Sequence, residues 1–384
     1  MTIPHRIQDF AEDLTAIRRD LHEHPELGFQ EVRTSGIVAA ELTRLGIEVT
    51  TGLGKTGVVG VLKGNRPGKT IGLRADMDAL PIDEQTNLPW SSKTPGVMHA
   101  CGHDAHTTML LGAARYLAED RDFAGTAVFI FQPAEEGLGG ARAMIADGLF
   151  TQFPCDEIYG LHNSPFHQPG EIGVKPGQAM AGANFFDITV TGKGAHAAMP
   201  EAAVDPVVIA ADLVGQMQSI KARNVPSGER IVVSITQIHA GSAYNVIPGE
   251  ATLAGTVRYF NRETAALVTE RMQALCDGAA VAYGCTVTLD MRNVFDVLEN
   301  DPTLSQAMLG VAAGLVGDLA MEKTELVMGS EDFADMLQVV PGAYCTVGHG
   351  SGVPLHNAGY VFDDASLPLG AAMLARMMEA RGAA

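Results

Sequence analysis

The chain has 384 residues, which is long enough for two domains of ordinary size. Hydrophobic residues make up 46% of it and charged residues 18%, as in a globular protein with a substantial core. The formal net charge of −19, from 26 basic and 45 acidic residues, argues against nucleic acid or an anionic membrane as a partner.

Cysteine usage and the N-terminus favour a reducing compartment. The cysteines are odd in number and widely scattered, a pattern that favours free thiols over a disulfide framework. The segment that starts at Met1 is amphipathic, and no window of the sequence reaches the roughly 18 apolar residues that a membrane span needs. We therefore expect a cytoplasmic protein with no membrane partner.

The first elements in chain order are two helices and three strands. Apolar side chains at helical spacing predict helices over 6–21 and 31–45, and the strands are expected at 47–51, 57–63 and 70–75. Residues 52–57 fit the pattern G-x-G-x-x-G, but a dinucleotide site needs a helix after the glycines, and Val58–Leu62 indicates a strand. This context argues against a nucleotide-dependent oxidoreductase and favours a glycine-rich turn between strands.

From residue 70 onward, strands and helices alternate. The expected elements are strand 70–75, helix 104–119, strand 125–131, helix 139–147 and strand 156–161. This alternation predicts an α/β fold with a largely parallel sheet, whose functional site lies beyond the carboxyl ends of the strands. Asp76 and Asp78 follow the first of these strands, Glu135 and Glu136 follow the second, and His162 ends the third.

The pattern changes in the next hundred residues. They predict strand 184–191, helix 206–221, strands 230–238 and 250–259, helix 263–281 and strand 284–290. This β-α-β-β-α-β order is the ferredoxin-like split unit. We therefore predict an inserted α+β domain at 184–292 within a larger domain made of 1–183 and 293–384. The larger domain continues with helices 303–315 and 330–337, strand 343–347 and a closing helix at 365–380.

The stretch Met98–His106 is the densest group of candidate metal ligands. It holds one thiol, three imidazoles and one carboxylate, and Cys and His are ligands for divalent transition metals. Cys101 and His103 lie on one short loop, close enough to bind the same ion. The alternative is a helix start that Asp104 caps, with the imidazoles partly solvated. Whether this stretch binds a metal or only starts a helix depends on whether other parts of the chain supply further ligands.

Several further residues are candidates of the same kind. If Glu135 and Glu136 lie on extended backbone, their side chains point to opposite sides, so one can bind a metal while the other faces a water. Taken alone, a histidine placed like His162 is more often a buried core residue than a ligand, and one placed like His356 is more often an exposed loop residue. The inserted domain adds three residues that alone would be assigned to the surface or to turns: His196, Asn245 and Arg258.

Taken together, these segments resemble a known family. They are Arg74–Pro81, His99–Asp104, Gln132–Glu136 and Asn245–Pro248, with Arg19–Leu27 as an opening segment. In this order they resemble the M20 metallopeptidases. They are most similar to the aminoacylase-type amidohydrolase branch, which includes hippurate hydrolases, N-acyl-amino-acid amidohydrolases and indole-acetyl-amino-acid hydrolases. The resemblance runs essentially from end to end.

This resemblance implies a zinc-peptidase-like catalytic domain with two divalent metal ions per subunit. The metal would be zinc, manganese, cobalt or nickel. Cys101 would bridge both ions through its thiolate, and the other ligands would be His103 and His162 for one ion, and Glu136 and His356 for the other. Glu135 would be the general base, and Asp78 would orient a ligand.

The inserted domain would act as a lid and as a dimerisation domain. His196 would reach into the partner subunit's active site and polarise the scissile carbonyl, while Asn245 and Arg258 would orient the substrate and bind its carboxylate. We therefore expect a homodimer or a higher homo-oligomer.

The expected activity is metal-dependent cleavage of the amide bond of N-acyl-L-amino acids with acetyl, benzoyl or longer acyl groups. The alternatives are a dipeptidase or an N-carbamoyl-amino-acid hydrolase with the same metals, and, from a different class, a non-catalytic binding protein of the same fold. Because Glu135 and all five ligand positions are present, the non-catalytic alternative is disfavoured.

Overall fold

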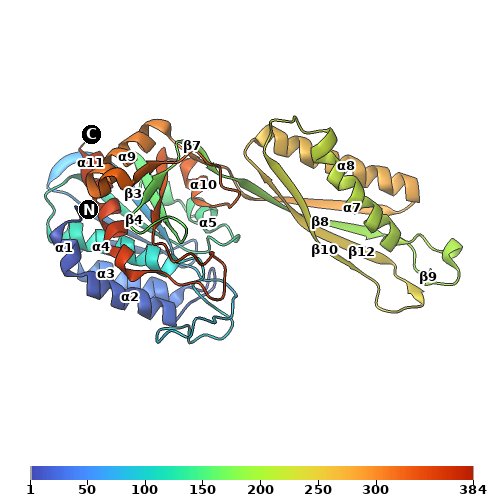
Figure 1. Cartoon of the computed structure of the whole chain (residues 1–384), viewed down its shortest axis with the longest axis horizontal. Helices are drawn as coiled ribbons and strands as arrows, with labels where there is room; N and C mark the ends of the chain where they lie inside the picture. Colours follow the sequence, from blue (N-terminus) through green and yellow to red (C-terminus); the bar gives the residue numbers. More distant parts are fainter. Residues whose placement is uncertain (1, 384) are drawn as a thin grey trace. The chain divides into compact units, whose positions relative to one another are not determined.

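The structure is a computed structural model that describes residues 2–383. It divides into two compact units, each with its own hydrophobic core (Figure 1). The first unit contains the chain up to Ala179, Leu298–Glu325 and the chain from Asp332 onward. The second contains Met180–Val297 and Leu326–Glu331. Between residues 2 and 383, no helix combines the length and the apolarity needed to cross a membrane.

The first unit is built on a mixed sheet with the strand order β1-β2-β4-β3-β5-β16-β6-β15. The strands are β1 (Glu48–Leu53), β2 (Gly57–Lys63), β3 (Arg66–Asp76), β4 (Ala124–Gln132), β5 (Glu157–Ser164), β6 (Ile172–Val174), β15 (Ala320–Glu322) and β16 (Gly342–Gly348). The central neighbours β4, β3, β5 and β16 run parallel, as do β6 and β15. The remaining pairs are antiparallel. This arrangement confirms the predicted α/β class with a largely parallel sheet.

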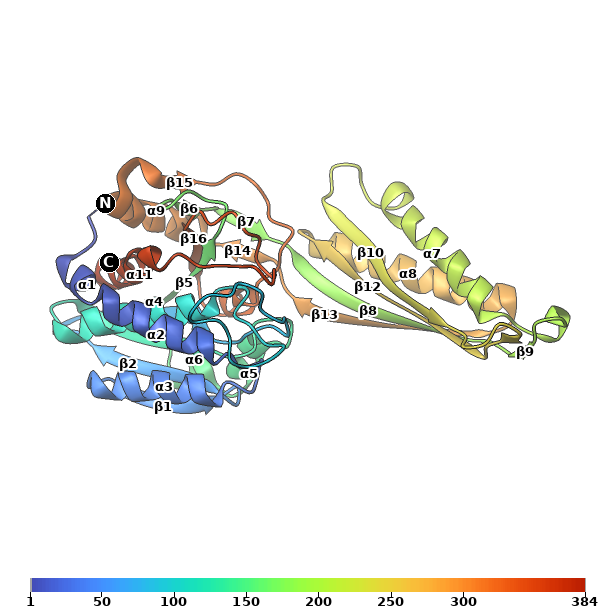
Figure 2. The ribbon, with the colours of Figure 1, turned by 60° about the horizontal axis from the view of Figure 1, so that its bottom comes forward.

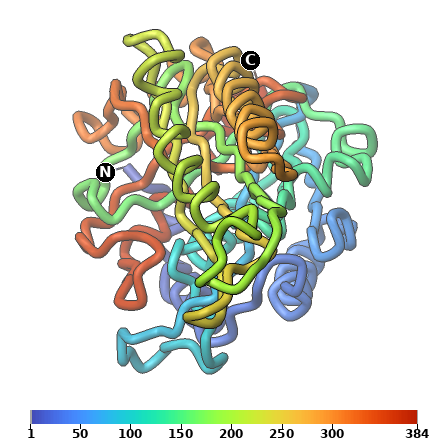
Figure 3. Tube along the Cα trace, turned by 90° about the vertical axis from the view of Figure 1, so that its right-hand side faces the viewer, coloured from blue at the N-terminus to red at the C-terminus, as the bar shows by residue number. Residues whose placement is uncertain are grey.

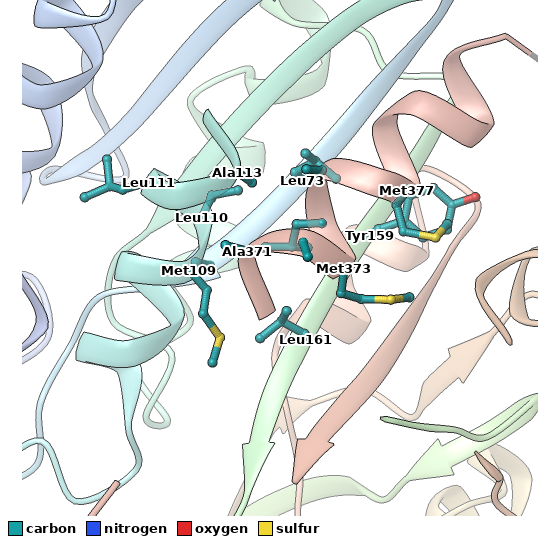
Figure 4. Close-up of a cluster of buried hydrophobic side chains, with 14 of the residues drawn as sticks. Leu73, Met109, Leu110, Leu111, Ala113, Tyr159, Leu161, Ala371, Met373 and Met377 are labelled. Carbon is teal, nitrogen blue, oxygen red and sulfur yellow. The ribbon is translucent and has the colours of Figure 1, made fainter. Parts of the chain in front are cut away.

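Helices pack against this sheet and against one another. They are α1 (His5–Asp9), α2 (Ala11–Glu23), α3 (Val32–Arg44), α4 (His103–Glu119), α5 (Gly140–Ala146), α6 (Leu149–Gln152), α9 (Pro302–Val316), α10 (Phe333–Leu337) and α11 (Leu367–Gly382). Helices α4 and α11 pack closely where Gly370 of α11 meets Met109 of α4. A Cβ atom at Gly370 would lie only 2.2 Å from the Met109 sulfur. Figure 4 shows their side chains meeting those of β3 and β5 in the buried core.

The predicted helix at 6–21 is two helices in the structure, because α1 ends before Phe10 and α2 begins after it. Both still bury their apolar side chains in the core of the first unit. Short elements were not predicted at all: β6, β15, the pair β7 (Gly177–Met180) and β14 (Leu298–Asn300), and the 3₁₀ helices η2 (Gly317–Leu319) and η3 (Asp364–Ser366). Segments of three or four residues are too short to show a hydrophobic period.

The second unit has an antiparallel sheet with the strand order β10-β12-β8-β13. Its elements are β8 (Gly182–Thr191), α7 (Pro206–Arg223), β10 (Ile231–Ala240), β12 (Glu250–Tyr259), α8 (Arg262–Tyr283) and β13 (Thr286–Phe295). Figures 2 and 3 show α7 and α8 side by side on one face of the sheet. Alternate residues of β12 are buried against them, which is the period of a sheet covered on one face. This is the predicted ferredoxin-like arrangement.

A small ladder extends the second unit beyond its main sheet. The two-residue strands β9 (Ala195–His196) and β11 (Val246–Ile247) pair antiparallel, and η1 (Pro200–Ala202) follows β9. Helix α7 starts as predicted, since the Asp205 side chain accepts a hydrogen bond from the Val207 N–H at 2.9 Å and Pro206 is the first helical residue.

An ion cluster ties β5 to α11 in the first unit. The Glu157 carboxylate accepts hydrogen bonds from Arg381 at 2.7 and 2.8 Å, from Lys69 at 2.8 Å and from the Tyr159 hydroxyl at 2.6 Å. Burial alone would raise the pKa of Glu157, but these three partners outweigh it and lower the pKa to about 2. Because the pKa is lowered, the cluster stabilises the fold above the ordinary glutamate pKa of 4.5, and this contribution is lost as the pH falls toward 2.

We expect Glu157→Gln to lower the free energy of unfolding by about 2–3 kcal/mol at pH 7, because the partly exposed Arg381 and Lys69 lose the buried carboxylate that they contact. The difference from the unchanged protein should shrink at pH 3.5. Urea unfolding at both pH values measures it. Glu41→Gln, which removes an exposed pair with Arg44, is the control and should change little. An equal loss at both pH values would contradict the electrostatic explanation.

Candidate metal centre

The predicted ligands of the first unit come from neighbouring strand ends and from the loops beside them. Strand β3 ends at Asp76, just before Asp78, and β4 ends before Glu135 and Glu136, while His162 lies within β5. Because β4, β3 and β5 are parallel neighbours, their carboxyl ends meet at one edge of the sheet.

The loop that carries Cys101 turns into α4 at Gly102. Gly102 has φ +86°, and a Cβ atom there would lie 2.4 Å from the side-chain nitrogen of Asn163. Only glycine fits this position without displacing a neighbour. The tight turn places Cys101 before the helix and His103 in its first turn.

Two groups of potential ligand atoms share the Cys101 thiol. One group is Cys101, His103 and His162, the other is Cys101, Glu136 and His356, and within each group the atoms lie within 4.8 Å of one another. The Cys101 sulfur is 3.4 Å from Nε2 of His162, and Nε2 of His356 is 3.1 Å from Oε1 of Glu136. The His356 N–H donates to the Ala100 carbonyl at 2.8 Å, so the two ligand loops are also joined by backbone. One sulfur thus lies between two clusters, as a ligand shared by two ions must.

The residues present fit a pair of divalent transition-metal ions. Nε2 of His103 is buried and has no hydrogen-bond partner within residues 2–383, and the buried Oε1 of Glu136 faces the site with the His356 ring 3.1 Å away. A buried polar atom without a partner costs about 1–3 kcal/mol, and a bound cation would satisfy both atoms. Thiolate, imidazole and carboxylate together suit zinc, cobalt, nickel or manganese.

The electrostatics of the site also indicate a place for positive charge. Burial raises the pKa of the Cys101 thiol, and Glu136 raises it further. Burial works to lower the pKa of His103, but the charges of Asp76 and Cys101 outweigh it and raise the pKa. Hydrogen bonds with Cys101 and Glu136 raise the pKa of His356 to about 10. A divalent cation reverses this balance, because it favours the thiolate and the neutral imidazole.

Glu135 and Glu136 lie in a turn, so the expectation of extended backbone at this pair is wrong. Ala134 has φ +54°, and the Gly137 N–H donates to the Glu135 carbonyl at 2.6 Å. Both carboxylates consequently approach the same imidazole, at 3.9 Å for Glu135 and 4.0 Å for Glu136 from Nε2 of His103. Ala134, whose backbone is in the left-handed conformation, turns the chain just before the two glutamates. The spacing of apolar residues in the sequence does not predict this turn.

Glu135 and Asp78 are held by backbone and side-chain contacts. Glu135 is 5% exposed, and the Asp332 N–H donates to its Oε1 at 3.4 Å. Asp78 contacts Nδ1 of His103 at 3.1 Å through one oxygen and accepts from the Glu136 N–H at 3.0 Å through the other. Asp78 therefore contacts one residue from each of the two ligand groups that share Cys101, namely His103 and Glu136.

The second unit brings two of its three candidates together. His196 on β9 pairs with Val246 on β11, and the Asn245 carbonyl accepts from the Ala197 N–H at 3.0 Å. His196 and Asn245 line a shallow groove of about 500 Å³. Arg258 lies on β12, at the end remote from β11, with its guanidinium 5.7 Å from the ring centre of Phe185.

Three buried polar residues lie beside the ligands: Asp76, His106 and Asn163. Asp76 and His106 were among the candidates from the sequence without an assigned role, and Asn163 was not predicted. Each is at most 2% exposed. The available signal was their position, because Asp76 and Asn163 interrupt or end apolar strands, and His106 lies one helical turn after His103.

Comparison with known proteins agrees with this geometry. The profile of peptidase family M20/M25/M40 matches residues 72–380. A hippurate hydrolase of Campylobacter jejuni is 43% identical over 98% of each chain, and an N-acetylcysteine deacetylase of Bacillus subtilis is 40% identical over 96% of each chain. A Bacillus subtilis crystal structure, described as a dinuclear metal binding peptidase from the M20 family, has a TM-score of 0.82 at 36% identity and covers 97% of this chain and 98% of that one. The chain therefore belongs to peptidase family M20/M25/M40.

Proposed function

We propose that this chain is a metal-dependent amidohydrolase that cleaves N-acyl-L-amino acids to a carboxylic acid and an amino acid. The observation that carries the proposal is the Cys101 thiol shared by two ligand groups, with the buried Glu135 carboxylate beside them. The hippurate hydrolase and the deacetylase among its relatives support the substrate class.

The proposed metal ligands are the residues of the two groups that both include the Cys101 thiol. Cys101 would contribute to both metal positions, with His103 and His162 completing one and Glu136 and His356 completing the other. Divalent ions bound there would lower the pKa of a water toward neutrality and would polarise the substrate carbonyl. Zinc, manganese, cobalt and nickel all suit this set.

Glu135 is the proton carrier of the proposed reaction. It takes a proton from the attacking water as the new carbon–oxygen bond forms, and it delivers that proton to the amine nitrogen as the carbon–nitrogen bond breaks. Its burial and the Asp332 N–H contact restrict the carboxylate to one position. Asp78 orients the His103 imidazole through their 3.1 Å contact.

His196 is the proposed donor to the carbonyl oxygen. Its Nδ1 accepts a hydrogen bond from the Ala198 N–H at 3.1 Å, so the neutral ring carries its proton on Nε2. An N–H donor of this kind stabilises the oxyanion that forms when the carbonyl is attacked.

The proposed assembly is a homodimer in which His196 of one subunit serves the active site of the other. In this proposal the second unit, predicted from the sequence at 184–292, forms the lid and the dimer contact, and the first unit forms the catalytic domain. Asn245, beside His196, orients the substrate. Arg258 binds the substrate carboxylate, an assignment supported by its NH1 group, which is buried and has no hydrogen-bond partner within residues 2–383. Free thiols throughout the described chain support a cytoplasmic location.

Protein purified without chelators is expected to contain about two divalent ions per chain and to hydrolyse at least one N-acyl-L-amino acid. The panel should include acetyl, benzoyl and long-chain acyl groups on one amino acid, two dipeptides and one carbamoyl amino acid. Removing the ions with a chelator should abolish turnover, and adding zinc, manganese, cobalt or nickel should restore it. Turnover of the dipeptides or the carbamoyl compound alone would contradict the proposed substrate class.

A further inference from the structure

Asn163 is the most fully hydrogen-bonded buried amide beside the metal centre. It is 2% exposed and follows His162 at the end of β5. Its side-chain nitrogen donates to the Cys101 carbonyl at 2.6 Å and to Nε2 of His106 at 3.0 Å. Its side-chain oxygen accepts from the Tyr360 hydroxyl at 2.8 Å and contacts Nε2 of His349 at 3.0 Å. Both the nitrogen and the oxygen of the Asn163 amide therefore have hydrogen-bond partners.

The chemistry of the neighbours fixes the orientation of this amide. The Cys101 carbonyl can only accept, so the group that faces it must be the NH₂ of Asn163. On the other side, His106 uses Nδ1 to bind the Asp76 carboxylate at 2.6 Å, which leaves Nε2 as the acceptor for both the backbone N–H and the side-chain NH₂ of Asn163. A carboxylate at position 163 would lose both donors.

The same residue also orients His162 through its backbone. Nδ1 of His162 contacts the Asn163 carbonyl at 2.7 Å, and a carbonyl only accepts, so the ring proton is on Nδ1. Nε2 of His162 is then left with its lone pair toward the Cys101 sulfur, 3.4 Å away. A metal-ligating imidazole needs this arrangement, with one nitrogen anchored and the other free to coordinate.

The rest of the network ties Asn163 to the sheet. Asp76 accepts from the buried Arg74 at 2.8 Å, and Arg74 also binds Gln132 at the end of β4. His106 therefore connects the amide of Asn163 to the Arg74–Asp76 ion pair on β3, whose arginine also donates to Gln132 on β4. The Asn163 amide also packs closely on Gly102, since a Cβ atom there would lie 2.4 Å from its side-chain nitrogen.

We infer that Asn163 is a positioning residue that fixes the Cys101 loop against His162, so that the affinity for the divalent ions depends on its side-chain NH₂. The inference rests on the metal centre of the proposed function. It assigns no contact with the substrate to Asn163. Substitutions in the shell that orients metal ligands typically cost 10–100-fold in metal affinity.

The test measures the dissociation constants of zinc and cobalt by competition with a chelator, for the full-length protein. Asn163→Asp keeps the size and both acceptor contacts but removes the donors, and Asn163→Ser shortens the side chain. Both variants should bind metal about 10–100-fold more weakly, and the thiolate-to-cobalt absorption band should weaken or shift. Tyr360→Phe removes only an acceptor-side contact and should change the affinity less than either.

Asn300 provides the matched control. It is a buried asparagine of the same unit, with its amide donating to the carbonyls of Lys175 and Tyr344 and accepting from the Tyr344 N–H. Asn300→Asp should lower the thermal stability and leave the metal affinity and the cobalt band unchanged.

The inference is overturned if the Asn163 variants bind metal as tightly as the unchanged protein, or if Asn300→Asp weakens binding equally. It is also overturned if neither Asn163 variant folds, since the residue would then serve the fold as a whole. Protein that binds two ions but hydrolyses no N-acyl amino acid would contradict the proposed function alone, because metal affinity is the measurement here. Protein that binds no divalent ion would overturn both.

Discussion

Replacing Glu135 with glutamine is expected to lower kcat by ~10²–10⁴ while the protein keeps both metal ions. Glutamine has nearly the shape of glutamate but cannot take a proton from water. Glu135 lies outside both groups that share Cys101, although its carboxylate is 3.9 Å from Nε2 of His103. Steady-state kinetics and metal analysis of the same preparation test both parts of the prediction.

The neighbouring residue supplies the control for this experiment. Glu136 belongs to a Cys101 group and is 3.1 Å from His356, so Glu136→Gln should lose metal from one of the two positions. If Glu135→Gln lost metal and Glu136→Gln kept it, Glu135 would be the metal ligand and Glu136 the general base. Full activity in Glu135→Gln would exclude it as the general base.

Replacing His196 with alanine is expected to lower turnover by ~10²–10³, since one donor to the oxyanion is lost. Mixing this variant with Glu135→Gln should restore activity if His196 acts across the dimer. A mixed dimer then has one complete site, made of Glu135 from one chain and His196 from the other. With random exchange of subunits, about a quarter of the unchanged activity is expected.

The mixing experiment needs proof that subunits exchange. Differently tagged chains, purified in tandem, isolate the mixed dimer, which should reach about half of the unchanged activity. Glu12→Gln on the exposed face of α2, in the first unit, serves as the control variant and should not alter complementation. Inactive mixed dimers would place His196 in the active site of its own chain, and a monomeric protein would contradict the assembly itself.

Much of the fold could be predicted from local patterns. The alternation of strands and helices, the cap at Asp205 and Pro206, and the glycine-rich turn at 52–57 all depend on neighbours in the sequence, and the structure contains each of them. The break of the first helix at Phe10 was missed because the apolar spacing continues across it. Parallel strands carry their carboxyl ends to one edge, which identified Glu136 and His162 as candidates, whereas the complete ligand set was implied by the family resemblance.

Local sequence patterns do not determine how the candidate site residues are arranged in space. The sequence offers Cys101, His162 and His356 as candidate ligands in three separate segments, but only the folded chain places one thiol in two ligand groups. The turn at Ala134 brings two adjacent carboxylates to one imidazole, contrary to the alternation of an extended strand.

Asn163 is the clearest example of this division. Its partners lie 57 to 197 residues away in the chain, on a helix and on loops that only the packed core brings together. Hydrophobic periods of 2 and 3.6 residues specify elements, because they depend on which face of each element is buried. The meeting of buried polar groups depends on how those elements pack, and each such group needs a partner that the neighbouring residues do not supply.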